Sequence, residues 1–396
     1  MKKNIAILGS TGSIGKILLN IVKKNNRIFE IILLTANKDH NTLYSQAKKY
    51  RVKNLIITNH VSYKILKKKC KNKNINVYNN YNFFNKIFKK KVDYTMNSIV
   101  GFAGLKPTLE IIKFTKQIAI ANKESIICGW NLIKKKSILN KTKIIPIDSE
   151  HYSIWSSLNE FNIKKSMNLN KSIQNLFITA SGGPFRNTSL KNFKNIKINQ
   201  AIKHPTWKMG KKISIDSATL VNKMFEVIEA QRLFNININK ISIKIHPQSY
   251  IHSIIQFRNG LIKICAHEPN MSIPIANSLD KNLNFSNKCQ TNFKILNSLN
   301  FTDVDKKKFP VIKILETYPK HCTLFDTALV SINDELVNLF LQKKISFKDI
   351  FNNLLYMLNL KSIKKLKKIV PKNYKEISEI NDFVRLKTHK LSICSN

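Results

Sequence analysis

Short hydrophobic runs alternate with segments of helical spacing along the first 148 residues. Six runs have the length and composition of buried strands: residues 5–8, 31–34, 55–58, 96–100, 118–121 and 143–147. Between the first two runs, Ile17, Leu18, Ile21 and Val22 recur at helical spacing, and Pro107 suits the first turn of a later helix. This alternation predicts an α/β fold with an N-terminal Rossmann-like, doubly wound parallel sheet in a domain over residues 1–148.

The pattern changes after residue 148. A strand is expected at 176–179, a helix at 217–234 and a hairpin at 254–266, in which Asn259-Gly260 favours a type I′ turn. These elements predict a central α+β catalytic domain over residues 149–270, with a flexible loop near 204–210.

Proline punctuates an irregular connector over residues 271–310. Helical patterns follow at 325–342, 346–358 and 376–391, and Ser346 with Asp349 resembles a capping box. The last part of the chain, residues 311–396, is therefore expected to form a C-terminal helical bundle.

Composition places the chain among globular, cytoplasmic proteins. With 396 residues and 43% hydrophobic content it can bury a large core. Its six cysteines are scattered without metal-ligand or disulfide-framework spacing, which favours a reducing compartment. Glycines interrupt the apolar run after the first residues, and no run approaches the roughly 20 residues of a membrane helix. Neither a signal peptide nor a membrane partner is expected.

The formal net charge of +45, from 68 Lys and Arg against 23 Asp and Glu, raises nucleic acid as a possible partner. The lysines, however, are spread over the whole chain among asparagine and isoleucine. A nucleic-acid footprint needs clustered basic residues with interleaved aromatics. We therefore expect no nucleic-acid partner; tight, salt-sensitive binding would support this alternative.

A glycine-rich segment carries the first candidate chemistry. Gly9, Gly12 and Gly15 follow a predicted strand directly and open a predicted helix. Glycines at such a turn let the backbone approach a pyrophosphate, and the helix N-terminus offers N–H donors. The spacing is GxxGxxG rather than GxGxxG, so a simple tight turn is the alternative.

The end of the second predicted strand bears on cofactor choice. An NAD site usually places an acidic residue here on the ribose hydroxyls, but the strand runs into Asn37 and Lys38, and Asp39 comes slightly late. Lys38 suits a 2′-phosphate, which favours NADPH. Lys38 as one more surface lysine is the alternative.

Acidic residues in two segments indicate a cation site. Asp148 and Glu150 follow the C-terminal end of a predicted strand, where open α/β sheets place ligands. Asn222, Lys223 and Glu226 share one side of a predicted helix, so Glu226 can complete a three-carboxylate site of the hard oxygen ligands that suit Mg²⁺ or Mn²⁺. A surface loop and an ordinary Lys-Glu helical pair are the alternatives.

Two further motifs suit a phosphorylated substrate. Ser181-Gly182-Gly183-Pro184 follows a predicted strand and can present a hydroxyl and N–H groups to an anion. The stretch from His204 to Gly210 includes Trp207 and suits a closing lid. A plain turn and a packed surface loop are the respective alternatives. His151 and His252 are weak signals alone, because a single histidine is more often structural.

These motifs form an ordered series that resembles the 1-deoxy-D-xylulose 5-phosphate reductoisomerase family. The segments that carry the resemblance are GSTGSIG at 9–15, ANKES at 121–125, DSEH at 148–151, SGGPF at 181–185, HPTWKMG at 204–210, the stretch 216–226 and HPQS at 246–249. They span most of the first 270 residues. The C-terminal region is similar less distinctly, chiefly over residues 328–341.

The resemblance implies a role for each motif residue. It assigns Asp148, Glu150 and Glu226 to Mg²⁺, Mn²⁺ or Co²⁺, and the substrate phosphate to Ser181, Ser217, Asn222 and Lys223. It implies that Lys123 and Ser149 contact the polar backbone of the substrate and that His204 and Trp207 belong to the closing loop. It also includes His151 and His252 among the catalytic or substrate-binding residues. NADPH is assigned to Gly9, Thr11, Gly12, Ser13, Ile14, Asn37, Lys38, Asn122, Glu124 and Gly210.

The implied reaction converts 1-deoxy-D-xylulose 5-phosphate, through an aldehyde that NADPH reduces, to 2-C-methyl-D-erythritol 4-phosphate in non-mevalonate isoprenoid biosynthesis. A homodimer is implied as well. One departure is Asn37, where the family more often has glycine. The rival enzyme is an aldehyde-oxidising dehydrogenase with a cysteine nucleophile, but no cysteine stands beside a histidine in a suitable motif. Full activity in EDTA would favour that rival.

Overall fold

A computed structural model describes residues 2–159, 169–207, 209–283 and 291–394. Lys208 of the predicted lid therefore lies outside the described residues. The chain divides into two compact units. The first comprises residues 1–125, 132–148 and 271–287, and the second comprises residues 126–131, 149–270 and 288–396. The four-part division expected from the sequence is finer than this one and stays a prediction.

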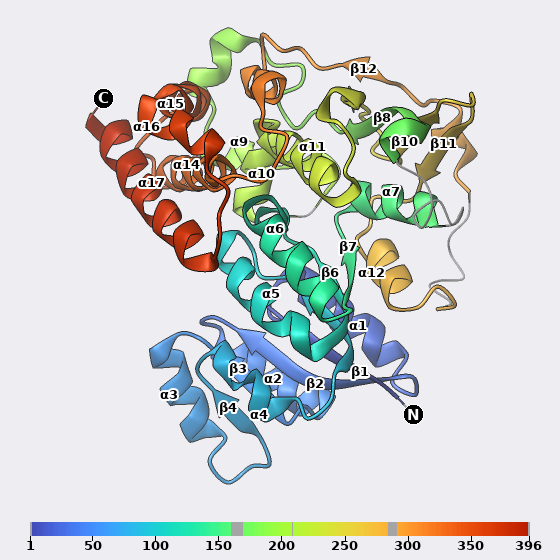
Figure 1. The fold of residues 1–396 in the computed structure, drawn as a ribbon, viewed down its shortest axis with the longest axis vertical. Helices are drawn as coiled ribbons and strands as arrows, with labels where there is room; N and C mark the ends of the chain where they lie inside the picture. The colour runs from blue at the N-terminus through green and yellow to red at the C-terminus, as the bar shows by residue number, and fades with distance from the viewer. Residues whose placement is uncertain (1, 160–168, 208, 284–290, 395–396) are drawn as a thin grey trace. The chain divides into compact units, whose positions relative to one another are not determined.

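A seven-stranded parallel sheet forms the centre of the first unit (Figure 1). Its strands are β1 (Lys3–Leu8), β2 (Phe29–Ala36), β3 (Asn54–Ile57), β4 (Asn76–Tyr78), β5 (Val92–Asn97), β6 (Thr115–Ile120) and β7 (Lys143–Pro146). The order β4-β3-β2-β1-β5-β6-β7 confirms the doubly wound prediction. The fourth predicted strand is β5, which begins and ends earlier than the expected residues 96–100. β4 was not predicted.

Helices connect these parallel strands. They are α1 (Ser13–Lys24), α2 (His40–Tyr50), α3 (His60–Lys69), α4 (Phe84–Ile87), α5 (Leu105–Ile111) and α6 (Lys123–Leu139). Helix α12 (Ser272–Leu279) comes from later in the chain and belongs to the same unit. The predicted apolar side of α1 is buried at Leu18, Ile21 and Val22. The direction of winding reverses between β1 and β5. Such a reversal leaves a crevice at the carboxyl ends of the two strands, where nucleotides bind in doubly wound folds.

The second unit contains a mixed five-stranded sheet in the order β11-β10-β8-β9-β12. Its strands are β8 (Ile173–Ala180), β9 (Ile241–Ile245), β10 (Ile251–Phe257), β11 (Ile262–Ala266) and β12 (Thr302–Asp303). Helices α7 (Ser149–Asn159), α8 (Leu169–Ser172), α9 (Ile198–Ala201), α10 (Lys211–Ala218) and α11 (Val221–Phe234) accompany it. The strand predicted at 176–179 is confirmed within β8, and the α+β character of this region is confirmed.

Two details of this region were predicted wrongly. The single helix expected at 217–234 is two helices, because Leu220 adopts a left-handed conformation with φ 57° between α10 and α11. The hairpin turn is not type I′, because Gly260 has positive φ but Asn259 does not. The Gly260 amide donates to the Phe257 carbonyl and the Phe257 amide to the Leu261 carbonyl. This is the pattern of a type I turn followed by a glycine bulge.

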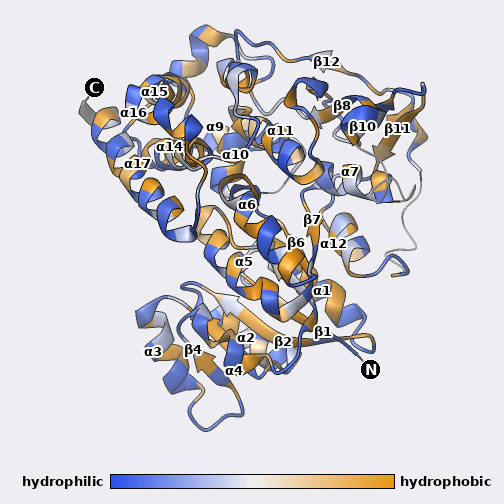
Figure 2. Ribbon diagram, viewed as in Figure 1, coloured by the Kyte–Doolittle hydropathy of each residue, from blue (hydrophilic) through white to orange (hydrophobic). Residues whose placement is uncertain are grey.

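The predicted C-terminal helices are confirmed as α14 (Leu324–Leu341), α15 (Phe347–Asn359) and α17 (Tyr374–Cys394), joined by α16 (Lys361–Lys364) and preceded by α13 (Phe293–Leu296). The Ser346–Asp349 capping box of α15 is present. Hydrophilic and hydrophobic turns alternate along α17 (Figure 2), whereas most residues of α14 are buried. Short 3₁₀ segments are η1 (Tyr81–Phe83), η2 (Phe102–Gly104), η3 (Ile112–Phe114), η4 (Leu190–Asn195), η5 (Ile238–Lys240), η6 (Pro310–Thr317) and η7 (Lys365–Lys368). Among the described residues, every helix is too short or too polar to cross a bilayer.

Candidate active site

The glycine-rich turn lies at the crevice between β1 and β5, within the first unit. Gly9 has φ 82°, which favours glycine, and a Cβ there would lie 3.1 Å from the backbone of Ser98 and Ile99. A Cβ on Gly15 would lie 2.6 Å from the Gly9 carbonyl oxygen, so α1 packs directly on the turn. The turn is held to the second strand, because the amides of Gly9 and Ser10 donate to the side chain and carbonyl of Thr35. The N-terminus of α1 is thus fixed at the crevice, as a pyrophosphate site needs.

The residues after β2 leave the ribose position without a free carboxylate. Asp39 caps α2, since its side chain accepts from the Thr42 amide at 3.0 Å, and these hydrogen bonds lower the Asp39 pKa. Asn37 and Lys38 are exposed before that cap. The capping role accounts for the late position of Asp39.

The segment after β6 shows a structural role for one predicted cofactor residue. Asn122 is 4% exposed and caps α6 by accepting from the Ser125 amide, while its Nδ2 donates to the carbonyls of Ile99 and Gly101. Its side chain therefore fixes the loop after β5. Next to it, the buried Lys123 ammonium lies 2.5 Å from Asp148 at the end of the same unit. Gly210, also predicted to hold NADPH, belongs to the second unit.

Helices α7 and α11 of the second unit bring two predicted metal ligands together. The Lys223 ammonium lies 2.6 Å from Oε1 of Glu150 and also pairs with Glu226. Asn222 donates to Glu226 at 2.5 Å, and Ser149 donates to Glu150 at 2.5 Å. Burial opposes the charge on Lys223, but the two carboxylates outweigh it and raise the Lys223 pKa. The ammonium therefore stays charged.

Asp148 completes the carboxylate group. It is the last residue of the segment 132–148 of the first unit, and the peptide chain joins it through Ser149 to Glu150. One oxygen from each of Asp148, Glu150 and Glu226 lies within 4.8 Å of the others. Three carboxylates at this spacing offer the hard donor set that Mg²⁺ and Mn²⁺ prefer. The donor chemistry thus fits a divalent cation.

The predicted phosphate residues gather around the break between α10 and α11. Gly183 has φ 68°, and a Cβ there would lie 2.9 Å from the Ser217 carbonyl, so the loop of Ser181 packs against the end of α10. The left-handed Leu220 then starts α11, whose first turn carries Asn222 and Lys223. The first amide of α11, that of Val221, donates to the Thr219 hydroxyl at 3.5 Å, and the positive end of the helix dipole favours an anion at this N-terminus. Asn222 and Lys223 therefore lie at the N-terminus of α11, and the loop of Ser181 lies against the end of the preceding helix.

The loop of His204 is tied to this group. Nδ1 of His204 accepts from the amides of Thr206 and Trp207, and its Nε2 lies 3.1 Å from the Ser181 hydroxyl. Burial and the Lys223 ammonium lower the His204 pKa to about 4. His204 is therefore neutral at physiological pH and holds the loop by hydrogen bonds.

Aromatic contacts join the other half of this loop to the second sheet. The Trp207 ring lies 6.2 Å from the His252 ring in an edge orientation, and His252 stacks on His267 at 3.8 Å. Nε2 of His252 donates to the His267 carbonyl at 3.1 Å. Within the described residues, His252 thus supports Trp207 through ring packing.

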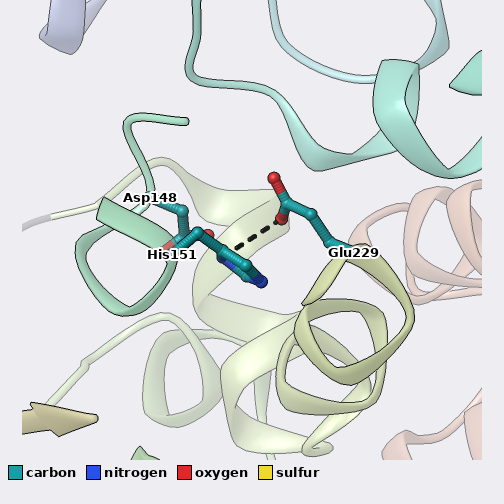
Figure 3. Close-up of side chains that lie close together, drawn as sticks. All are labelled: Asp148, His151 and Glu229. Atoms are coloured by element: carbon teal, nitrogen blue, oxygen red, sulfur yellow. Dashed lines mark ion pairs between the residues drawn. The ribbon is translucent and has the colours of Figure 1, made fainter. Parts of the chain in front are cut away.

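His151 anchors the Asp-Ser-Glu-His segment to α11 (Figure 3). Its ring is fully buried, with Nε2 2.8 Å from the Glu226 carbonyl and Nδ1 3.4 Å from Glu229. Sequence reasoning missed Glu229, although residues 222, 226 and 229 stand at i, i+4 and i+7, the spacing of one helix face. That spacing was a usable signal.

A second missed group lies behind Ser217. The carboxylate of Asp216 is 2% exposed, accepts from Asn333 of α14 at 2.8 Å and pairs with Lys212 at 3.1 Å. The sequence placed Asp216 in a motif but gave no sign of its partner, because Asn333 stands 117 residues later.

Family models of 1-deoxy-D-xylulose 5-phosphate reductoisomerase match most of the chain. The reductoisomerase model matches residues 5–129, and two models of C-terminal domains match residues 144–234 and 267–387. The chain is 52% identical to 1-deoxy-D-xylulose 5-phosphate reductoisomerase of Pelagibacter ubique (strain HTCC1062), over 99% of this chain and 100% of the relative. It is 38% identical to that of Buchnera aphidicola subsp. Schizaphis graminum, over 98% of each chain.

Solved structures agree with the sequence relatives. The reductoisomerase of Zymomonas mobilis in complex with NADPH matches with a TM-score of 0.85 and 29% identity, over 99% of both chains. A DOX-P reductoisomerase in complex with NADPH, fosmidomycin and magnesium matches with a TM-score of 0.88 and 29% identity, over 99% of this chain and 98% of that chain. With three family models along its length and a relative identical at more than half of its positions, this chain belongs to the 1-deoxy-D-xylulose 5-phosphate reductoisomerase family.

Proposed function

We propose that this protein converts 1-deoxy-D-xylulose 5-phosphate to 2-C-methyl-D-erythritol 4-phosphate, using NADPH and a divalent metal ion. The observation that carries the proposal is the convergence of Glu150 and Glu226 beside Lys223, with Asp148 two residues before Glu150. The carboxylates can bind a cation, and the neighbouring ammonium can bind a phosphate. Both groups at one place suit a substrate that has a keto-diol end and a phosphate end.

The phosphate end of the substrate is assigned to the start of α11. Ser181 and Ser217 offer hydroxyl donors, Asn222 an amide and Lys223 an ammonium, and the helix dipole favours an anion there. His204 is neutral, so it orients the Ser181 hydroxyl by a hydrogen bond instead of adding charge. Trp207 then covers the bound substrate when the loop closes and excludes water.

The polar end of the substrate is assigned to the carboxylates and their neighbours. A bound Mg²⁺, Mn²⁺ or Co²⁺ supplies Lewis-acid stabilisation of the negative charge that develops on the substrate oxygens. Asp148, Glu150 and Glu226 would hold the ion, Ser149 orients Glu150, and Lys123 neutralises Asp148 at 2.5 Å. Manganese and cobalt are included as candidate ions on the family resemblance.

The cofactor is assigned to the crevice between β1 and β5. NADPH supplies the hydride for the reduction. The turn from Gly9 to Ile14 would take the pyrophosphate, and Asn37 and Lys38 the 2′-phosphate, since Asp39 is engaged as a helix cap. Two related structures described as NADPH complexes support this choice.

The test is a coupled absorbance assay. Purified protein, Mn²⁺ and NADPH are mixed with 1-deoxy-D-xylulose 5-phosphate, and the nicotinamide band should fall with formation of 2-C-methyl-D-erythritol 4-phosphate by mass spectrometry. EDTA should abolish the reaction, and excess Mn²⁺ should restore it. Full activity in the presence of EDTA would contradict the proposed role of the metal ion. A thiol-dependent dehydrogenase has little support, because burial raises the pKa of Cys128 and Cys322, the latter to about 12.

We also infer a homodimer. Strand β11 is at the edge of its sheet, and Leu261, Ile262 and Ile264 are each more than half exposed. An apolar edge strand of this kind is a pairing surface for another chain. Sedimentation velocity should give a dimer for the parent and a monomer for Ile264→Lys; a monomeric parent would contradict the inference. A cytoplasmic location is proposed because Cys70, Cys128 and Cys322 are buried thiols outside any disulfide, which suits a reducing compartment.

A further inference from the structure

We propose that Glu229 is a positioning residue for the divalent cation and acts through His151 rather than as a ligand. The inference rests on the proposed function. Glu229 is 1% exposed on α11, and its Oε2 lies 3.4 Å from Nδ1 of His151. Figure 3 shows the two side chains facing one another from α11 and α7.

The contacts of His151 explain what Glu229 controls. The Glu226 carbonyl oxygen can only accept, so the 2.8 Å contact requires the proton to be on Nε2 of His151. The ring also stacks on Phe234, with 6.4 Å between centroids and 11° between planes. His151 thereby contacts α11 at three points, and it directly follows Glu150 in the chain.

The consequence is a fixed distance between two cation-binding side chains. Glu150 is in the first turn of α7 and Glu226 in α11, and His151 joins these two helices through the Glu226 backbone and the Glu229 side chain. Residues that hold metal ligands in place from the outer shell typically change metal affinity about 10- to 100-fold when they are lost, and His151 is in this position because it contacts the backbone of Glu226.

Glu229 is also close enough to other groups to be considered a ligand. One atom each of Asp148, His151 and Glu229 lies within 4.8 Å of the others. We assign Glu229 to positioning because its carboxylate faces the imidazole, whose other nitrogen is already engaged by a carbonyl. The two roles predict different behaviour of an amide at this position. A glutamine can donate to or accept from Nδ1 and so keep His151 in place, but it is a poor cation ligand.

The experiment measures Mn²⁺ affinity of the full-length protein by calorimetry and electron paramagnetic resonance, without substrate or NADPH. We expect Glu229→Leu to raise the Mn²⁺ Kd about 10- to 100-fold, and Glu229→Gln to stay within about threefold of the parent. His151→Phe, which keeps the stacking on Phe234, should match Glu229→Leu. The double variant of Glu229→Leu and His151→Phe should have an Mn²⁺ Kd no higher than that of the weaker-binding single variant, because both substitutions remove the same contact between α7 and α11.

The control is Glu335→Leu, which removes a different buried glutamate from a histidine pair, the one with His389 at 2.7 Å. It should leave the Mn²⁺ Kd unchanged. Equal losses in Glu229→Gln and Glu229→Leu would make Glu229 a ligand, and an unchanged Kd in folded Glu229→Leu would make it merely structural; either result overturns the proposal. Should Glu229→Leu fail to fold by circular dichroism, His151→Phe and Glu229→Gln decide alone. If Glu226→Gln leaves Mn²⁺ binding intact, the proposed function itself fails.

Discussion

The Nε2 atom of His204 lies 3.1 Å from the hydroxyl oxygen of Ser181, and two backbone amides donate to the other ring nitrogen. A nitrogen that accepts from amides carries no proton, so the imidazole is neutral and donates to Ser181. The loop of His204 and the loop of Ser181 are therefore joined by a contact that protonation of the ring would disturb.

This contact gives a prediction for pH. The His204 pKa is lowered to about 4 by burial and by Lys223, against roughly 6.5 in an unfolded chain. Because the unfolded state binds the proton more tightly, the stability from neutral His204 is present above about pH 6.5 and is lost as the pH falls toward 4. Histidine NMR should place the titration well below pH 6. In His204→Gln, urea unfolding should depend less on pH over this interval, and an identical dependence would contradict the assignment.

Glu226→Gln should lower kcat by more than the roughly 100-fold that is typical of residues which only support a ligand. The amide removes one charged oxygen from the carboxylate group, whereas the glycine-rich turn belongs to the other unit and is unchanged. NADPH affinity, measured by quenching of nicotinamide fluorescence, should therefore stay near that of the parent. Near-normal turnover would refute the metal role of Glu226.

Lys223→Ala should mainly raise the KM for the phosphorylated substrate. A hydrogen bond to a charged group contributes about 1.5–3 kcal/mol, which corresponds to roughly a 10- to 150-fold effect. Since Lys223 also pairs with Glu150 and Glu226, a smaller fall in kcat is expected. Steady-state kinetics at saturating Mn²⁺ separates the two effects. Unchanged kinetics would show that Lys223 does not contact the phosphate.

Gly15→Ala should destabilise the first unit. The new Cβ would lie 2.6 Å from the Gly9 carbonyl oxygen and the Ser10 Cα, so backbone must move. Overpacking of this kind typically costs about 1–3 kcal/mol, and the displaced turn should weaken NADPH binding. Thermal unfolding with and without NADPH measures both effects. Gly210→Ala is the stability control, because a Cβ there meets no atom within 4 Å; equal unfolding temperatures for the two variants would contradict the argument.

Asp326→Leu should destabilise the second unit through Arg232. The Asp326 carboxylate is fully buried, lies 2.9 Å from Arg232 and accepts from the Tyr318 hydroxyl at 2.7 Å. Removing one partner leaves an uncompensated buried guanidinium, which costs about 3–5 kcal/mol. Urea unfolding measures the loss. If the free energy of unfolding fell by less than about 1 kcal/mol, as for exposed ion pairs, the buried pair would not contribute to stability as argued.

The sequence by itself determined most strands of the first sheet and the main C-terminal helices, because burial on both faces of a parallel sheet imposes continuous apolar runs, and turns and caps have local chemistry. Local interactions between residues a few positions apart produce the turn from Gly9 to Gly15, the helix cap at Ser346, and the placing of Lys223 and Glu226 on one side of a helix. The motif series was sufficient by itself to place the chain in its family.

Tertiary structure alone decided which distant residues meet. Several features depend on contacts between segments 20 or more residues apart: the hydrogen bond of Asn122 to a carbonyl of another loop, the pairing of His151 with Glu229, and the pairing of Asp216 with Asn333. The helix break at the left-handed Leu220 was likewise not visible in the sequence. Local patterns carry no record of such contacts, because a side chain's partner is set by how the elements pack and not by its neighbours in sequence.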